Sequence, residues 1–155
     1  MTAIHQLETP ALLLDREKLA RNIERMRSHL RALRVDLRPH VKTAKSIDVV
    51  RQALIAQPGG ITVSTLKEAE YFFRHGVRDI VYAVGIAPTK LPRIIELIRG
   101  GARLTVLLDS VAAADTVAQA AAGAKVVIPV LIELDVDGHR AGVEPDSSLL
   151  LDVAR

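Results

Sequence analysis

The sequence predicts an α/β fold with a parallel sheet, and three observations carry this prediction. Short apolar runs alternate along the chain with longer stretches in which apolar residues recur at steps of three and four. The expected strands begin near residues 35, 61, 79, 103 and 130, roughly 18–27 residues apart, which leaves room for a right-handed crossover helix between neighbours. The chain has 155 residues, of which 49% are hydrophobic and 25% charged, so it can bury the core of one domain.

About five βα units are too few to close an eight-stranded barrel. The pattern therefore leaves two architectures open, an open doubly wound sheet or part of a (β/α)8 barrel of the TIM type. The last expected helix, residues 147–155, has no C-terminal cap or glycine. We therefore expect the chain to be the N-terminal portion of a longer protein.

The first elements follow from apolar spacing. An apolar run at 11–14 is closed by Asp15, and a long helix is expected after it, with an apolar stripe at Leu19, Ile23, Met26, Leu30 and Leu33. Polar and apolar residues then alternate from Val35 to Lys42, which predicts a strand. A helix is expected from Asp48 to Ala56, ended by Pro58-Gly59-Gly60.

Capping signals and prolines delimit the remaining elements. After a short strand at 61–64, Thr65 and Glu68 have the spacing of a capping box and predict a helix that ends at Gly76. A strand at 79–84 precedes a helix that begins at Pro88, because proline suits the first helical position. A strand at 103–108, an alanine-rich helix that begins at Ser110 and a strand at 130–136 complete the pattern.

Composition excludes several classes of function. Without cysteine, the chain has no disulfide, no thiolate metal site and no cysteine nucleophile. Two Tyr, two Phe and no Trp argue against base stacking. No run approaches the ~18 apolar residues of a membrane span and no signal-peptide pattern opens the chain, so we expect a cytoplasmic protein without a membrane partner. The net charge of +3 does not by itself indicate nucleic-acid binding.

Two of the expected strands carry one charged row each. Asp36, Arg38, His40 and Lys42 alternate with apolar residues in the first strand, and Glu133, Asp135 and Asp137 do so in the last. In a barrel such rows face the lumen, where enzymes place their chemistry near the C-terminal strand ends. Edge strands with one solvated face, or a structural network of ion pairs, would give the same pattern.

Lys42 ends the first strand. A lysine becomes a nucleophile toward carbonyls only after it loses a proton, and neighbouring cations favour that loss. Arg38, His40 and Lys45 are the candidates for such neighbours. A lone lysine would more often be a solvated surface charge.

Several segments together resemble one enzyme family. Residues 9–15, Asn22-Ile23 and Arg38-Pro39-His40-Val41-Lys42-Thr43 are similar to the D-threonine aldolase / D-serine dehydratase family. Segments 60–70, 80–83, 107–110 and 133–143 extend the resemblance along the chain in the same order. This family has the alanine racemase N-terminal barrel of the fold-type III pyridoxal phosphate enzymes.

The resemblance implies a function and a set of site residues. Lys42 would bind pyridoxal 5'-phosphate as a Schiff base, Arg140 and Ser64 would lie beside the cofactor ring, and His40 would stack on it or bond near it. It implies a lyase for D-3-hydroxy amino acids, of the D-threonine aldolase or D-serine dehydratase type, and a homodimer at full length. Residues 1–15 would contribute a strand to a separate C-terminal β domain, and residues 16–155 would form an incomplete cofactor-binding barrel.

The resemblance implies a divalent metal, zinc or manganese, bound only through residues beyond position 155. Glu133, Asp135, Asp137 and His139 have suitable donor atoms, but on one strand they would span roughly 20 Å, too far for a single ion. We therefore expect no metal site within the chain. The resemblance also implies that the remaining barrel strands, the phosphate-binding cup and a C-terminal β domain are missing here, so the 155 residues alone are expected to be inactive.

Three alternatives stay open from the sequence. The protein could be an amino-acid racemase, or a non-catalytic barrel that binds pyridoxal phosphate. A more remote alternative is nucleic-acid binding by the first helix, because residues 16–45 contain ten Lys or Arg against three Asp or Glu, an excess of +7. We expect no nucleic-acid partner, since a solvated helix face explains that excess.

Overall fold

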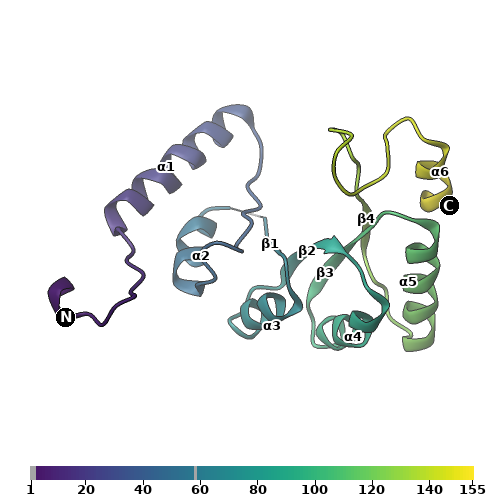
Figure 1. Ribbon diagram of the computed structural model, residues 1–155, viewed down its shortest axis with the longest axis horizontal. Coiled ribbons are helices and arrows are strands. Elements are labelled where there is room, and N and C mark those ends of the chain that lie inside the picture. Colours follow the sequence, from purple (N-terminus) through teal and green to yellow (C-terminus); the bar gives the residue numbers. More distant parts are fainter. Residues whose placement is uncertain (1–2, 58) are drawn as a thin grey trace. The chain divides into compact units, whose positions relative to one another are not determined.

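The computed structural model describes residues 3–57 and 59–155; residues 1 and 2, and Pro58 of the expected Pro58-Gly59-Gly60 turn, lie outside the described residues. The chain divides into two compact units, Met1–Leu37 and Arg38–Arg155. The first unit contains a 3-10 helix, η1 (Ile4–Gln6), and helix α1 (Arg16–Leu33). The second contains the sheet, the 3-10 helix η2 (Pro88–Lys90) and, among its described residues, five α-helices (Figure 1). Its helices and strands have these bounds: α2 Ile47–Leu54, β1 Ile61–Val63, α3 Leu66–Arg74, β2 Asp79–Gly85, α4 Leu91–Arg99, β3 Arg103–Leu108, α5 Val111–Ala124, β4 Val130–Ile132 and α6 Ser148–Ala154.

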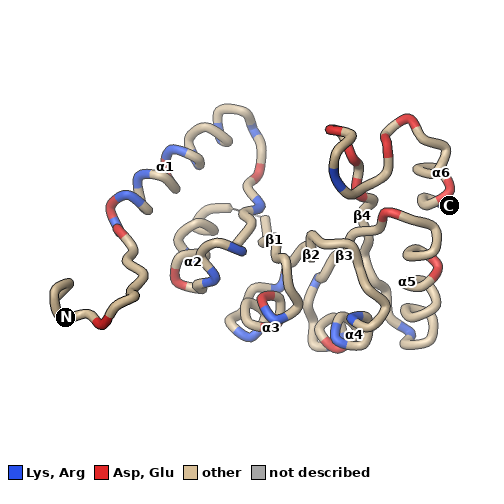
Figure 2. Tube along the Cα trace, viewed as in Figure 1, with Lys and Arg blue, Asp and Glu red and all other residues tan. Residues whose placement is uncertain are grey.

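Helix α1 confirms the long helix predicted from the apolar stripe. The Asp15 carboxylate caps it by accepting a hydrogen bond from the backbone N–H of Lys18 at 2.9 Å. Arg34, in the left-handed conformation with φ of 56°, ends the helix. Basic residues recur along α1 (Figure 2) and none of its residues is buried. Residues 11–14 form no strand, and their place in a separate β domain stays a prediction.

The four strands of the second unit form one parallel sheet in the order β1-β2-β3-β4. Each strand therefore lies beside the strand that precedes it in the chain. A doubly wound sheet reverses its strand order at a switch point, whereas a barrel adds its strands in sequence. This order decides between the two architectures and confirms a partial TIM-type barrel.

One face of the sheet packs on α3 and α4, and α5 packs against α4 (Figure 1). The side chains that this face presents lie in register across β1, β2 and β3 and are fully buried: Ile61, Ile80 and Leu104 in one row, Val63, Tyr82 and Val106 in the next. The alternate residues Thr62, Val81 and Thr105 form a row on the opposite face and are half-buried. The helix-covered face thus holds the core, as the apolar pattern predicts.

The strand predicted from Val35 to Lys42 is wrong in length. Only one parallel bridge forms there, between His40 and Thr62. Two backbone hydrogen bonds of 2.9 Å hold this bridge, from Val41 N–H to Thr62 O and from Thr62 N–H to Pro39 O. Pro39 has no N–H to offer, so the ladder cannot extend toward Val35 in the regular pattern. The segment nevertheless continues the sheet order at the β1 edge, and four regular strands rather than five are formed.

The strand predicted from Val130 to Val136 is also shorter, because β4 ends at Ile132. Glu133 N–H still donates to Leu108 O at 2.8 Å, and the chain then turns into a loop that returns through a bridge between Leu134 and Val143. The Asp135 carboxylate accepts hydrogen bonds from the backbone N–H groups of three loop residues: Asp137, Gly138 and Arg140. The expected alternation of acidic side chains along one strand therefore does not form.

The expected helices occur with small shifts at their ends. The helix predicted from Asp48 to Ala56 is α2, and the one predicted from Pro88 begins as η2 before α4. Ser110 and Ser147 cap α5 and α6 through their hydroxyl groups. Among the described residues, no helix is both long and apolar enough to cross a bilayer.

Two glycines give a matched test of packing. A Cβ at Gly60 would collide with the backbone oxygen of Asp79, whereas a Cβ at Gly123, in α5, would meet nothing within 4 Å. We expect Gly60→Ala to lower the free energy of unfolding by about 2 kcal/mol or more, because backbone must move. Gly123→Ala should raise it by up to about 1 kcal/mol through helix propensity. Urea unfolding followed by circular dichroism measures both; equal effects of the two variants would contradict this packing.

Candidate active site

The C-terminal ends of the strands meet at one edge of the sheet, because all strands are parallel. His40 forms the bridge to Thr62, Lys42 follows it at this edge, and Ser64 directly follows β1. Asp109 follows β3, and Glu133 follows β4. In barrel enzymes this edge holds the active site.

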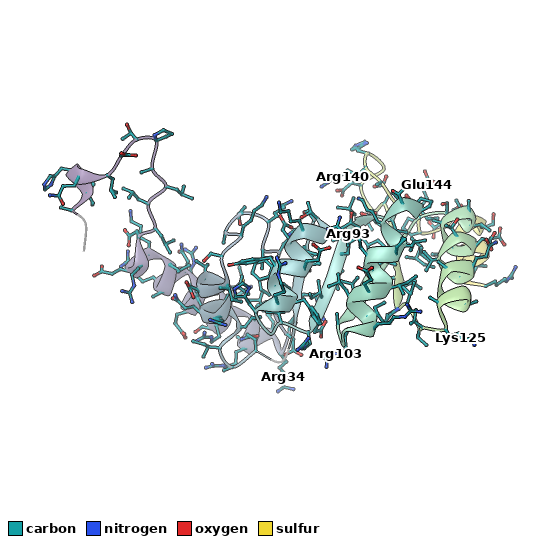
Figure 3. The ribbon with its side chains drawn as sticks, turned by 90° about the horizontal axis from the view of Figure 1, so that it is seen from below. Arg34, Arg93, Arg103, Lys125, Arg140 and Glu144 are labelled. Atoms are coloured by element: carbon teal, nitrogen blue, oxygen red, sulfur yellow. The ribbon has the colours of Figure 1, made fainter. Side chains whose placement is uncertain are left out.

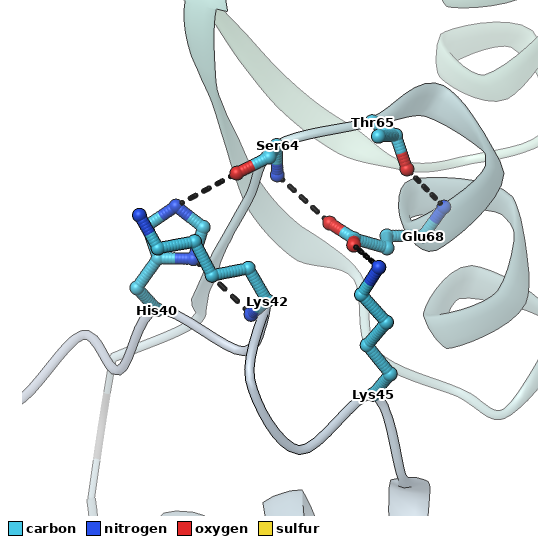
Figure 4. A network of polar contacts seen from close by, with 6 residues as sticks. All are labelled: His40, Lys42, Lys45, Ser64, Thr65 and Glu68. Atoms are coloured by element: carbon cyan, nitrogen blue, oxygen red, sulfur yellow. Dashed lines mark hydrogen bonds and ion pairs between the residues drawn. The ribbon is translucent and has the colours of Figure 1, made fainter.

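Six residues form a network of polar contacts at the β1 end of this edge (Figure 4): His40, Lys42, Lys45, Ser64, Thr65 and Glu68. The Ser64 Oγ lies 3.2 Å from the His40 Nε2, and the backbone N–H of Lys42 donates to the His40 Nδ1 at 3.3 Å. The backbone N–H of Ser64 donates to the Glu68 Oε2 at 2.9 Å, and the Lys45 Nζ lies 3.2 Å from the Glu68 Oε1. Three of the four predicted site residues, Lys42, His40 and Ser64, are therefore brought together.

Local backbone geometry explains how these residues meet. Lys45 has a φ of 45°, and its N–H donates to Val41 O at 3.0 Å, so the chain turns directly after the bridge. Thr65 caps α3 by accepting a hydrogen bond from Glu68 N–H at 3.1 Å, which confirms the first half of the predicted capping box. The Glu68 carboxylate binds the N–H of Ser64, one residue before the cap. The helix start therefore orients the Ser64 backbone.

Burial and charge act on His40 and Glu68. Desolvation, and then the ammonium of Lys42, lower the pKa of His40, and the Glu68 carboxylate partly opposes them. For Glu68, burial alone would raise the pKa. The hydrogen bond from Ser64 and the contact with Lys45 outweigh burial, so that the pKa of Glu68 is lowered. Near neutral pH the network therefore contains a neutral imidazole beside an ionised carboxylate.

Two of the cations expected to act on Lys42 have carboxylate partners. Arg38 lies 2.6 Å from Asp79 at the start of β2, the opposite edge of the sheet from Lys42, so the expectation that Arg38 acts on Lys42 is wrong. The hydrogen bond from Arg38 lowers the pKa of Asp79. Lys45 is at the right edge, but it pairs with Glu68. Of the three candidates, His40 is the one in direct contact with Lys42, because its Nδ1 accepts the backbone N–H of Lys42.

Arg140 lies outside this network, on the exposed loop between β4 and α6. Its backbone N–H donates to Asp135 at 3.1 Å. Figure 3 places Arg140 at the opposite end of the strands from Arg103, the first residue of β3. Its predicted place beside a cofactor ring stays a prediction.

The sequence pattern predicted Glu68 as a capping residue alone and did not indicate its contact with the Ser64 backbone. The available signal was the burial expected for a residue on the inner side of a helix that directly follows a strand. Glu68 is 7% exposed and is the buried charged residue of the described chain. Within residues 3–57 and 59–155, no group of three or more His, Cys, Asp or Glu is arranged to bind a metal ion.

The comparisons with known proteins identify the family of the chain. The model of the alanine racemase N-terminal domain family matches residues 14–154. The chain belongs to this family. An alanine racemase of Clostridium difficile, 13% identical with a TM-score of 0.72 over 88% of this chain and 36% of its own, shares the fold.

Two relatives extend the comparison. D-threo-3-hydroxyaspartate dehydratase of Delftia sp. is 48% identical over 94% of this chain and 38% of its own length. Its solved structure matches with a TM-score of 0.93, over 96% of this chain and 40% of that one. D-threonine aldolase of Arthrobacter is 32% identical over 94% of this chain and 38% of its own length. The chain thus spans less than half of these relatives.

The charges around His40 predict two opposite pKa shifts. Lys42→Ala removes a positive charge that lowers the pKa of His40, so the pKa should rise. Glu68→Gln removes a negative charge that raises it, so the pKa should fall. NMR titration of the His40 ring measures both. Lys67→Ala, on the exposed side of α3, serves as the control and should leave the titration unchanged; shifts of the same sign for Lys42→Ala and Glu68→Gln would contradict this geometry.

Proposed function

We propose that this chain is the cofactor-binding part of a pyridoxal phosphate-dependent lyase that acts on D-3-hydroxy amino acids. The observation that carries the proposal is the position of Lys42, an exposed lysine at the C-terminal edge of a barrel sheet, whose backbone N–H donates to His40, the residue that also contacts Ser64. Relatives named as dehydratases and aldolases for such substrates support it.

The donor groups at this edge suit pyridoxal phosphate. The Lys42 Nζ is the amine that its aldehyde requires, and the exposed side chain leaves it accessible. The Ser64 hydroxyl and the His40 ring are neutral hydrogen-bonding groups beside it. Arg140 is proposed as a further contact to the ring, as the family resemblance implies.

The cofactor, when bound, supplies an electron sink for negative charge at the substrate Cα. The residues of this chain bind that cofactor and orient it. Lys42 must give up the proton at its Nζ before it acts as a nucleophile. His40, kept neutral by its surroundings, adds no charge beside that amine, and it orients the Ser64 hydroxyl.

The substrate is proposed to carry a hydroxyl on Cβ. The dehydratase and aldolase relatives differ in which bond at Cβ breaks, so both reactions belong to the proposed class. A mutant of D-threo-3-hydroxyaspartate dehydratase has been solved in a metal-free form, which supports a divalent metal, zinc or manganese, in the full-length protein. The residues that bind this metal would lie beyond position 155. A cytoplasmic homodimer remains part of the proposal.

Covalent capture of the cofactor tests the role of Lys42. The full-length protein, incubated with pyridoxal phosphate and reduced with borohydride, should gain on the peptide that contains Lys42 the mass of one cofactor less one oxygen atom, because condensation releases water and the reduction adds two hydrogens. Lys42→Ala should lose both this adduct and the visible absorbance of the bound cofactor, because the amine is gone. Lys67→Ala, an exposed lysine of α3, is the matched control and should keep both. An adduct that persists in Lys42→Ala would overturn the proposal.

Product analysis then identifies the reaction. Elimination of the hydroxyl from D-serine or D-threo-3-hydroxyaspartate yields a keto acid and ammonia, whereas cleavage of D-threonine yields glycine and an aldehyde. Racemisation with neither product, or cofactor binding without turnover, would replace the lyase proposal by the racemase or the non-catalytic alternative.

A further inference from the structure

The hydrogen bonds around His40 have a defined direction. The backbone N–H of Lys42 can only donate, and its acceptor is the His40 Nδ1 at 3.3 Å. Nδ1 must therefore present a lone pair. In a neutral imidazole the single proton is then on Nε2.

This tautomer determines which way the contact with Ser64 runs. An Nε2–H group donates to the Ser64 Oγ across the 3.2 Å that separates them. The hydroxyl of Ser64 accepts that bond, so its own hydrogen is not used by His40. Ser64 thus keeps a hydrogen-bond donor for another acceptor.

The Glu68 carboxylate binds the backbone of Ser64, whereas His40 contacts its side chain. The carboxylate accepts the backbone N–H of Ser64 at 2.9 Å, and Glu68 is 7% exposed. Burial of a carboxylate is unfavourable unless it is paired and hydrogen-bonded, and the ammonium of Lys45 at 3.2 Å provides the pair. The carboxylate is thus held from two sides and restrains the Ser64 backbone.

We propose that Glu68 is a positioning residue: through Ser64 it keeps His40 in the Nε2–H tautomer and leaves the Ser64 hydroxyl to donate to an oxygen of the ligand bound at Lys42. The ligand part rests on the proposed function. The tautomer part does not, because it follows from contacts among the residues of this chain.

Nitrogen NMR of the His40 ring, recorded without cofactor above the pKa of His40, tests the tautomer. The signals are assigned with His40→Gln. In the wild-type chain, Nε2 should carry the proton. Glu68→Ala leaves the Ser64 N–H without its acceptor, so the ratio of the Nε2–H to the Nδ1–H form should fall roughly fivefold, as expected for one lost hydrogen bond. Glu68→Gln retains an amide oxygen as acceptor and should restore the wild-type ratio.

Glu70→Gln is the matched control. Glu70 lies two residues further along α3 and pairs with Arg93 at 2.6 Å, so this variant removes a carboxylate from the same helix without touching Ser64. It should leave the tautomer ratio unchanged. A proton on Nδ1 in the wild type, or an unchanged ratio in Glu68→Ala, would overturn the proposal. If Glu68→Ala does not fold, the test uses the two remaining samples: a proton on Nδ1 in the wild type, or a tautomer ratio in Glu68→Gln that differs from the wild type, would overturn the proposal.

The donor role of Ser64 is tested by cofactor affinity. Ser64→Ala should raise the Kd for pyridoxal phosphate about fivefold, and Ser64→Thr, which keeps a hydroxyl, should restore it. Equal affinity of Ser64→Ala and wild type would overturn this role. Failure of the covalent adduct at Lys42 would overturn the proposed function but leave the NMR result standing, so the two failures are distinguishable.

Discussion

Two backbone hydrogen bonds, which join Pro39 and Val41 to Thr62, are the constraint on which the candidate site depends. They attach the segment that carries Lys42 to the edge of β1 in parallel register. Parallel register brings the ends of both segments to the same edge of the sheet, so His40 and Lys42 lie beside Ser64 rather than at the opposite end. Without this pairing, the network of Figure 4 would not form.

A buried carboxylate is the second constraint. Glu68 would destabilise the fold if it were alone, because an ion loses its hydration on burial. The backbone of Ser64 and the ammonium of Lys45 compensate that loss, and in doing so they connect the start of α3 to the turn after His40. The same contacts that satisfy the carboxylate therefore arrange the groups around the proposed cofactor lysine. Stability and the proposed function therefore depend on the same contacts.

The fold was largely predictable, and the exceptions have physical causes. Apolar spacing located the helices and the buried strands because burial follows the period of each element. The strands expected at 35–42 and 130–136 were too long, since alternation of polar and apolar residues cannot tell a paired edge from a loop. At 35–42, Pro39 interrupts the ladder. At 133–143, the side chain of Asp135 binds loop backbone, an alternative that competes with strand pairing.

The sequence by itself determined the fold class, the family resemblance and Lys42 as the candidate nucleophile, because period, capping and motif are local properties of the chain. Tertiary structure alone decided which charges meet. It joined Arg38 to Asp79 and Lys45 to Glu68, over separations of 41 and 23 residues, and it set the direction of the hydrogen bonds at His40. Such pairings depend on strand order and register, which no local pattern specifies.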